Sequence, residues 1–163
     1  MDKPKYRDNL ITKPIYELSS EGPIKGRQTP PMTYVSDKLI PQSDVYIRFG
    51  WIYDMPDPNP HIYEHTHNYD EIVLHIGTDS ENPEDLGAEL EFIVDGESII
   101  INKTSALFIP KGVKHGPLTW KNVRRPHLEM SVLPGTSKFV EARPGGFILG
   151  EDTSVFKNGG MDK

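Results

Sequence analysis

Apolar and polar side chains alternate along several short stretches of this chain, which is the pattern of β-strands. The clearest stretch is residues 45–53, Val-Tyr-Ile-Arg-Phe-Gly-Trp-Ile-Tyr, in which every second side chain is aromatic or β-branched and shares one face. Tyr46 and Arg48 lie on the other face. The pattern leaves open which face looks into the core. Arg48 is therefore either a carboxylate anchor inside a cavity or an exposed arginine of a sheet, and we expect the exposed arginine.

Further strands follow, separated by turn signals. Residues 71–76 carry apolar side chains on both faces, as in a strand between a cavity and a second sheet. Residues 89–101 have the pattern of a β-hairpin, with Asp95-Gly96 in the turn. Residues 118–120 predict a further short strand. Fifteen prolines and fourteen glycines, with few segments of helical period, favour a β-rich fold with many turns.

The last clear strand, residues 126–133, leaves a choice between its two faces. Its apolar side chains Leu128, Met130 and Val132 alternate with His127, Glu129 and Ser131. If the polar face looks inward, His127 and Glu129 add an acid/base pair to a cavity. We expect a solvated polar face instead, because polar faces of strands usually meet water.

The length and composition of the chain limit the classes of protein to which it can belong. A chain of 163 residues suits one domain with a sizeable core. With no cysteine there are no disulfides, thiolate ligands or cysteine nucleophile. Eighteen basic against 24 acidic residues, a net charge of −6, argues against a nucleic-acid partner. No apolar run reaches the length of a membrane span, and the polar N-terminus lacks a signal peptide, so we expect no membrane partner and a cytoplasmic protein.

Candidate chemistry lies in two segments about forty residues apart. In an extended strand His65 and His67 point the same way, and Asn68-Tyr-Asp70 is a turn signal that brings Glu71 back on the next strand. His115 follows Pro110-Lys-Gly112, where proline and glycine set a bend before a new strand. Three imidazoles and a carboxylate are a ligand set for a divalent metal with open positions.

These two segments resemble the motifs of the cupin superfamily, over roughly residues 44 to 133. His65, His67, Glu71 and Gly77 match the first motif, G-x5-H-x-H-x3-4-E-x6-G, although its leading glycine is missing and its last interval is one residue short. Pro110, Gly112 and His115 match the second, G-x5-P-x-G-x2-H-x3-N, in which Thr104 and Thr119 replace glycine and asparagine. The departures concern turns, whereas all four ligand positions are kept.

The resemblance implies an all-β, double-sheet jelly-roll barrel with the metal inside one end. We expect an irregular N-terminal arm over residues 1–43 that packs on the barrel or on a partner subunit, a barrel with its closing segment over residues 44–150, and a tail over residues 151–163. The acidic segment 77–88 is expected to be a peripheral loop. Cupins commonly dimerise through sheet edges, so we also expect a homodimer.

For function, the resemblance implies one divalent transition metal per chain, held by His65, His67, Glu71 and His115, with Fe, Mn, Ni, Co and Zn all compatible. We expect an enzyme of the dioxygenase, isomerase, lyase or decarboxylase type, acting on a small polar chelating molecule. The alternative is a non-catalytic cupin that binds or stores a small ligand. A regulator is a weaker option, because no helix-turn-helix segment accompanies the barrel.

Strand parity suggests three further residues for the cavity. Tyr63 has the parity of His65 and His67, and His61 then lies near the cavity's mouth. His75 has the parity of Glu71, and is either an acid or base near the metal or a histidine satisfied by a neighbouring side chain. With Glu129, Tyr63 and His75 are the candidate catalytic residues.

Overall fold

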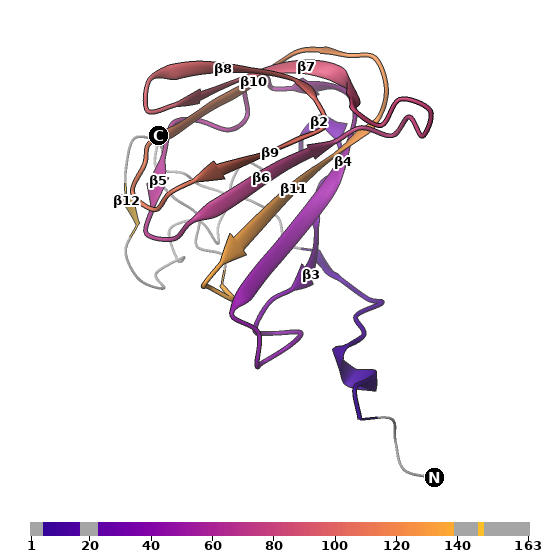
Figure 1. Cartoon of the computed structure of the whole chain (residues 1–163), viewed down its shortest axis with the longest axis vertical. Helices are drawn as coiled ribbons and strands as arrows, with labels where there is room; N and C mark the ends of the chain where they lie inside the picture. Colours follow the sequence, from indigo (N-terminus) through magenta and orange to yellow (C-terminus); the bar gives the residue numbers. More distant parts are fainter. Residues whose placement is uncertain (1–4, 17–22, 139–146, 149–163) are drawn as a thin grey trace.

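A computed structural model describes residues 5–16, 23–138 and 147–148 of the chain (Figure 1). This part of the chain consists of β-strands and one short 3₁₀ helix, η1 (Arg7–Asn9). The strands are β1 (Ile15–Tyr16), β2 (Lys25–Arg27), β3 (Met32–Val35), β4 (Val45–Asp57), β5 (Thr66–His67), β6 (Glu71–Ile76), β7 (Asp85–Val94), β8 (Glu97–Lys103), β9 (Ser105–Ile109), β10 (His115–Val123), β11 (His127–Pro134) and β12 (Phe147–Ile148).

Two antiparallel sheets face each other, and the expected all-β double-sheet jelly roll is confirmed. The larger sheet runs β1-β3-β4-β11-β6-β9, with β2 also paired to β4. The smaller sheet, β10-β7-β8, lies above it in Figure 1. A third pairing joins β12 to β5 in parallel. The buried apolar core comes mostly from the smaller sheet, which contributes Leu86, Leu90, Phe92, Ile101, Leu118 and Trp120.

Strand β4 resolves the choice between its two faces. Tyr46 and Ile52 are buried, whereas Trp51 and Tyr53 on the aromatic face are exposed. The Tyr46 hydroxyl is 2.8 Å from the hydroxyl of buried Thr33 on β3, which gives this polar tip a partner inside the barrel. Arg48 shares the inward face and is half-buried, so the expectation of an exposed arginine is wrong.

Strand β11 also turns its polar face inward, contrary to the expected solvated face. His127 is fully buried and Glu129 is 9% exposed. Leu128 lies between Trp51 and Ile76 in the sheet, on the outer face. The predicted alternation of polar and apolar side chains along β11 is correct, but the predicted direction of its polar face is wrong. The polar side chains are buried because their partners come from strands that are distant in the sequence.

The acidic segment 77–88 is only partly a loop. Strand β7 begins at Asp85, and Leu86 and Ala88 belong to the buried core. A side chain at Gly77 would clash with the backbone of Asp85, so the backbones of these two residues lie close together.

The hairpin prediction is confirmed: β7 and β8 pair across Asp95 and Gly96, both at positive φ (49° and 80°) as a tight two-residue turn requires.

Residues of the expected N-terminal arm add strands to the larger sheet. β2 and β3 both pair with β4, and β1 pairs with β3. In Figure 1 the segment with η1 leads away from the sheets, and η1 buries no side chain. The domain boundaries stay predictions, and the tail over residues 151–163 lies outside the described residues. No helix in the described ranges is long and apolar enough to cross a membrane.

Candidate metal centre

The four predicted ligands come from segments of three different sheets. His67 ends β5, Glu71 begins β6 of the larger sheet, and His115 begins β10 of the smaller sheet. His65 lies beside His115, and the pair exchanges two backbone hydrogen bonds of 2.8 and 3.0 Å. The site therefore lies where the two sheets and the β5 segment meet.

Local hydrogen bonds hold the two motifs against each other. The Gly112 N–H donates to the His67 carbonyl at 2.9 Å, and the Lys111 N–H donates to Asp70 Oδ1 at 2.8 Å. Gly112 has a φ of 79°, a conformation that favours glycine. The Pro-x-Gly bend thus docks on the turn at residues 68–70, and strand β10 starts at His115 as the sequence predicts.

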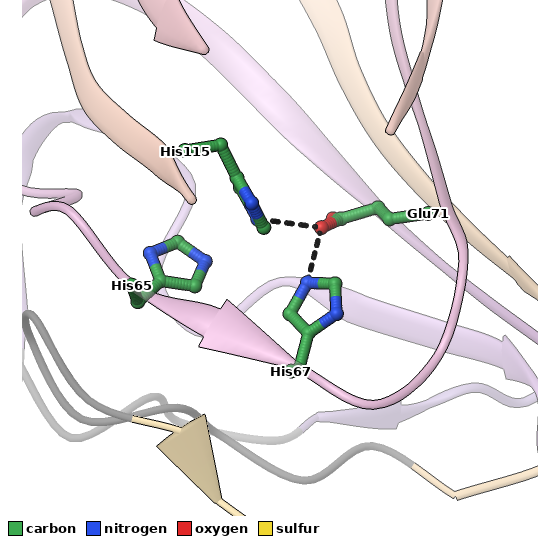
Figure 2. Close-up of side chains that lie close together, drawn as sticks. All are labelled: His65, His67, Glu71 and His115. Carbon is green, nitrogen blue, oxygen red and sulfur yellow. Dashed lines mark hydrogen bonds and ion pairs between the residues drawn. The ribbon is translucent and has the colours of Figure 1, made fainter. Parts of the chain in front are cut away.

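The four side chains converge on one point, as Figure 2 shows. Each offers one ligand atom, and these atoms all lie within 4.8 Å of one another. Glu71 Oε2 is 3.0 Å from His67 Nε2 and 3.4 Å from His115 Nε2. His67 and His115 are buried, whereas His65 and Glu71 are partly exposed.

The orientation of all three imidazoles is fixed by the same kind of hydrogen bond. Nδ1 of His65 lies 2.6 Å from the Tyr63 carbonyl, Nδ1 of His67 lies 2.9 Å from the Tyr69 carbonyl, and Nδ1 of His115 lies 2.8 Å from the Val113 carbonyl. A carbonyl only accepts, so each Nδ1 carries the proton and each Nε2 remains for a ligand. This is the tautomer that metal-binding histidines need.

The charges at the cluster fit a divalent cation. Burial raises the pKa of Glu71, but the neighbouring imidazoles of His115 and His67 outweigh it and hold the pKa well below its usual range. Burial, aided by His115, lowers the pKa of His65 to about 4. Because each Nδ1 donates its proton to a carbonyl, the Nε2 atoms of His67 and His115 carry lone pairs. These lone pairs face a carboxylate oxygen, which is also an acceptor, so a proton or a cation is needed between them. The cluster could therefore hold a metal ion, and that it does so stays a prediction.

Tyr69 is a residue of the site that sequence reasoning missed. Its ring stacks on His67, with the two centroids 4.0 Å apart and the planes 8° from parallel. In the sequence, Asn68-Tyr69-Asp70 is recognisable only as a turn. The signal that could have found it is its place two residues after a ligand, in a turn that must fold back over that ligand. The stack and the Tyr69 carbonyl together fix both tilt and rotation of the His67 ring.

Tyr63 does not line the interior as expected. Its side chain is 45% exposed, and its backbone carbonyl accepts the hydrogen bond from His65 Nδ1. Residues 61–65 form isolated bridges at Ile62 and His65 instead of a continuous strand, so strand parity does not extend back to Tyr63. A catalytic role for this tyrosine stays a prediction.

His75 and Glu129 lie in a second polar cluster away from the candidate ligands. His75 is four residues beyond Glu71 on β6, which separates their Cα atoms by about 13 Å along the strand. Its Nε2 lies 3.7 Å from Glu129 Oε2, and the two residues are directly paired between β6 and β11. The structure therefore places His75 away from the candidate ligands, and neither of its ring nitrogens has a hydrogen-bond partner. The catalytic roles of His75 and Glu129 stay predictions.

Arg27 and His61 complete this second cluster, and neither was a site candidate. The Arg27 guanidinium donates to His61 Nε2 at 2.7 Å and to Glu129 Oε1 at 2.9 Å. Burial raises the pKa of Glu129, but Arg27 and then His75 outweigh it and hold the pKa below its usual range. His61 is 1% exposed and stacks on Trp120, so its expected place near the mouth of the metal cavity is wrong.

His127 is the remaining member of the second cluster. Its Nε2 accepts the Trp120 indole N–H at 3.3 Å. Burial, aided by nearby charges, lowers the pKa values of both His61 and His127 to about 4. Within the described residues, the group that could hold a metal consists of His65, His67, Glu71 and His115 alone, and the second cluster is a buried network of a different kind.

Comparisons with known proteins return structural matches only. No family model and no curated protein matches the chain. KdgF from Halomonas sp. is 14% identical, with a TM-score of 0.44, over 68% of this chain and 79% of that one. A putative ethanolamine utilization protein Q from Salmonella typhimurium LT2 is 19% identical, with a TM-score of 0.41, over 65% and 68%.

An RmlC-like cupin from Shewanella frigidimarina NCIMB 400 is 13% identical, with a TM-score of 0.39, over 58% of this chain and 69% of that one. Likeness at this level says nothing of activity. Chemistry has to be argued from the side chains at the site.

Proposed function

We propose that this chain, which has the cupin fold, is a mononuclear metal-dependent enzyme acting on a small polar, chelating molecule. The observation that carries the proposal is the convergence of three imidazoles and one carboxylate within 4.8 Å, with every imidazole turned by an Nδ1 hydrogen bond so that Nε2 faces the others. Such a set suits Fe, Mn, Co, Ni or Zn in the divalent state.

The ligand set also favours an anionic oxygen donor as substrate. Three neutral imidazoles and the Glu71 carboxylate contribute one negative charge, so a divalent ion would leave one positive charge at the site. A bound metal would supply Lewis acidity toward an oxygen of the substrate. Of the four residues, His65 and Glu71 are partly exposed, and His67 and His115 are buried. A hydroxy acid, keto acid or diketone meets these requirements.

One observation favours the second candidate function, a non-catalytic cupin that binds or stores a small ligand. An enzyme that moves protons needs an acid or base within reach of the substrate. His75 and Glu129 lie in the second cluster, with His75 Nε2 3.7 Å from Glu129 Oε2, and the Tyr63 side chain is 45% exposed. A reaction at this site must then rely on the metal and on groups of the substrate itself.

The test is an activity screen of protein loaded with one defined metal at a time. Hydroxy acids, keto acids, diketones, sugars and catechol-like compounds are incubated with and without dioxygen and followed by mass spectrometry. Product that requires oxygen identifies a dioxygenase, and an isomerised, cleaved or decarboxylated product without oxygen identifies the other classes. A compound that binds tightly and returns unchanged with every metal would establish the binding function. The His115→Ala variant is the control for metal that acts free in solution.

A further inference from the structure

A surface depression lies at the end of strand β4 that is remote from the candidate metal ligands. It is lined by Arg27, Gln28, Thr29, Trp51, Tyr53 and Pro126. Strand pairing joins Trp51 to Leu128 and Leu128 to Ile76, the last residue of β6, whereas Glu71 is the first residue of that strand. In Figure 1, β2 beside the depression and β5 of the metal centre lie at opposite ends of the sheets. The depression is therefore separate from the metal centre.

Two aromatic side chains form an exposed apolar platform in this depression. Trp51 and Tyr53 are two residues apart on β4, so both point to the same face of the sheet, with about 7 Å between them. Ile52 between them is fully buried, whereas Trp51 is 39% and Tyr53 is 55% exposed, so this face is the outer one. Such neighbouring exposed aromatic side chains are a common feature of binding sites, because a ligand that covers them removes apolar surface from water.

Polar side chains with weak internal partners lie beside the platform. Gln28 and Thr29 directly follow β2, and the Gln28 N–H donates to the Trp51 carbonyl at 2.8 Å, which holds this segment against β4. The Gln28 side chain has only two contacts of 3.4 Å, from the Trp51 N–H and to the Pro30 carbonyl. The Thr29 hydroxyl has backbone contacts of 3.4 to 3.5 Å. These distances exceed those of good hydrogen bonds, so the amide and the hydroxyl can take better partners from a ligand.

The charge of the depression favours a neutral ligand. Among its lining residues in the described part of the chain, Arg27 alone is charged. Its guanidinium pairs with buried Glu129 at 2.9 Å, and only 13% of the Arg27 side chain is exposed. A phosphate or carboxylate in the depression would compete for this cation and leave Glu129 as an unpaired buried charge. An anionic ligand is therefore disfavoured.

The shape and the polar groups together indicate an oligosaccharide. The depression has a volume of about 450 Å³, which is enough for one sugar ring. The C–H face of a sugar ring packs on aromatic side chains, and its hydroxyls both donate to and accept from amides and hydroxyls. Because Trp51 and Tyr53 cover a ligand from one side only, the depression suits one unit of a longer chain better than a small molecule that must be enclosed.

A proline-rich peptide is the other ligand that binds to exposed aromatic side chains. Its prolines have no N–H, so such a peptide offers carbonyl acceptors but few donors. The side-chain oxygens of Gln28 and Thr29 would then lack a partner. This difference favours the sugar.

We propose that the depression binds a neutral oligosaccharide, with one sugar ring on Trp51, the neighbouring unit on Tyr53, and ring hydroxyls bonded to Gln28 and Thr29. The site requires neither the metal nor the proposed activity. It would hold the protein on a glycan while the metal centre at the other end of the sheets stays accessible.

The test uses the tryptophan fluorescence of the full chain. The chain has two tryptophans, and Trp120 is 1% exposed, so a change in quenching by acrylamide reports on Trp51. Neutral oligosaccharides of glucose, xylose, mannose, galactose and N-acetylglucosamine are titrated to millimolar concentration. At least one should bind saturably and protect Trp51 from acrylamide.

Isothermal titration calorimetry with the sugar that binds then compares single variants. Trp51→Ala should raise the Kd by about 10-fold or more. Gln28→Ala and Thr29→Val, which each remove hydrogen bonds to the sugar, should raise it by about 3- to 10-fold. The matched control is Tyr16→Ala, which removes a 61% exposed aromatic side chain on β1 and should bind like wild type. If Trp51→Ala fails to fold, Tyr53→Ala and Gln28→Ala decide the result.

Three outcomes would overturn the proposal. The first is that no sugar of the panel binds at millimolar concentration, whether or not a proline-rich peptide does. The second is sugar binding that Trp51→Ala, Tyr53→Ala and Gln28→Ala all retain. The third is binding that is lost in His115→Ala and kept in Trp51→Ala, which would place the sugar at the metal centre.

Discussion

At the scale of single residues, the six histidines of the chain divide into two sets of three. His65, His67 and His115 each donate Nδ1–H to a carbonyl two residues away in the sequence, which leaves Nε2 free to face a shared centre. In the second set, His61 and His127 use Nε2 to accept from Arg27 and Trp120. The first set could hold an ion, whereas in the second set His61 and His127 make buried hydrogen bonds and both ring nitrogens of His75 lack a partner.

This division predicts metal content. Wild type should carry close to one divalent metal per chain, while His67→Ala and His115→Ala should lose most of it, because each removes one Nε2 ligand. Elemental analysis of the purified proteins measures this. The matched control is His75→Asn, which alters a buried histidine on the neighbouring cluster and should keep its metal. Undiminished metal in both alanine variants would refute the assignment of the site.

The second set predicts acid sensitivity of the fold. The pKa values of His61 and His127 are lowered to about 4 in the folded protein, against the usual 6.5 for histidine. Between these values the unfolded chain binds protons that the folded chain does not. Stability is therefore full above pH 6.5 and falls as the pH drops toward 4, by about 1.4 kcal/mol per pH unit for each group.

Urea unfolding at pH 7.5 and 5.0, in the presence of a chelator so that metal release does not contribute, should show a loss of a few kcal/mol in the free energy of unfolding. In the His127→Asn variant, unfolding should take up about one proton fewer in this pH range, so the free energy of unfolding should change less with pH. A free energy of unfolding that is the same at both pH values would contradict the prediction.

At the scale of elements, β2 is joined to the interior by one side chain. Arg27 reaches from β2 to Glu129 on β11 and to His61, and only 13% of its side chain is exposed. The buried Glu129 carboxylate depends on this cation, because its other oxygen, Oε2, has no hydrogen bond. The arm that sequence reasoning treated as a wrapping segment thus supplies a charge that the barrel interior requires.

Removal of that cation should be costly. Arg27→Met leaves Glu129 as an unpaired buried charge and should lower the free energy of unfolding by about 3–5 kcal/mol. A second substitution, Glu129→Gln, should recover a large part of the loss. Lys121→Met is the control, since its pair with Glu91 at 2.9 Å is 45% exposed on the lysine side and should matter by less than about 1 kcal/mol. If urea unfolding shows the same loss of free energy of unfolding for Arg27→Met and Lys121→Met, the Arg27–Glu129 pair does not act as a buried ion pair.

The segment between β6 and β7 gives a second prediction at this scale. Replacement of residues 79–83 by two glycines should change the free energy of unfolding by no more than about 1 kcal/mol, because loop closure depends weakly on length. Leu86→Ala, only a few residues later, should cost about 2–5 kcal/mol because Leu86 is fully buried in the core. Thermal unfolding and metal content of both variants test this. A shortened loop that abolishes folding would show that residues 79–83 pack on the barrel.

The sequence predicted the strands and the convergence of the four candidate ligands because both follow from local patterns. Alternation sets period, Asp95-Gly96 sets a turn, and Pro-x-Gly starts β10 at His115. The orientation of β4 and β11 could not be predicted, because the inward polar side chains Arg48, His127 and Glu129 depend on partners far away in sequence. Arg27 and Glu129 are 102 residues apart, and no local pattern indicates that pair.

At the scale of the whole molecule, the candidate ligands join parts that share no strand pairing. Glu71 belongs to the larger sheet, His115 to the smaller sheet, and His67 to the β5–β12 pair. The ion that fits between them would therefore act as a cross-link between both layers of the jelly roll. Metal binding and global stability are expected to be coupled for this reason, as they are wherever a ligand binds the folded state alone.

The coupling predicts a metal-dependent melting temperature. Stripping wild type with a chelator should lower Tm, and added metal should restore it, with a gain of about 2.7 kcal/mol when free metal reaches 100 times its Kd. Differential scanning fluorimetry across metal concentrations measures the shift. His115→Ala should melt at one temperature with or without metal, since it unlinks the smaller sheet, whereas His75→Asn should respond like wild type. A wild type that contains metal by elemental analysis yet melts unchanged after chelation would show that the ion binds without joining the sheets.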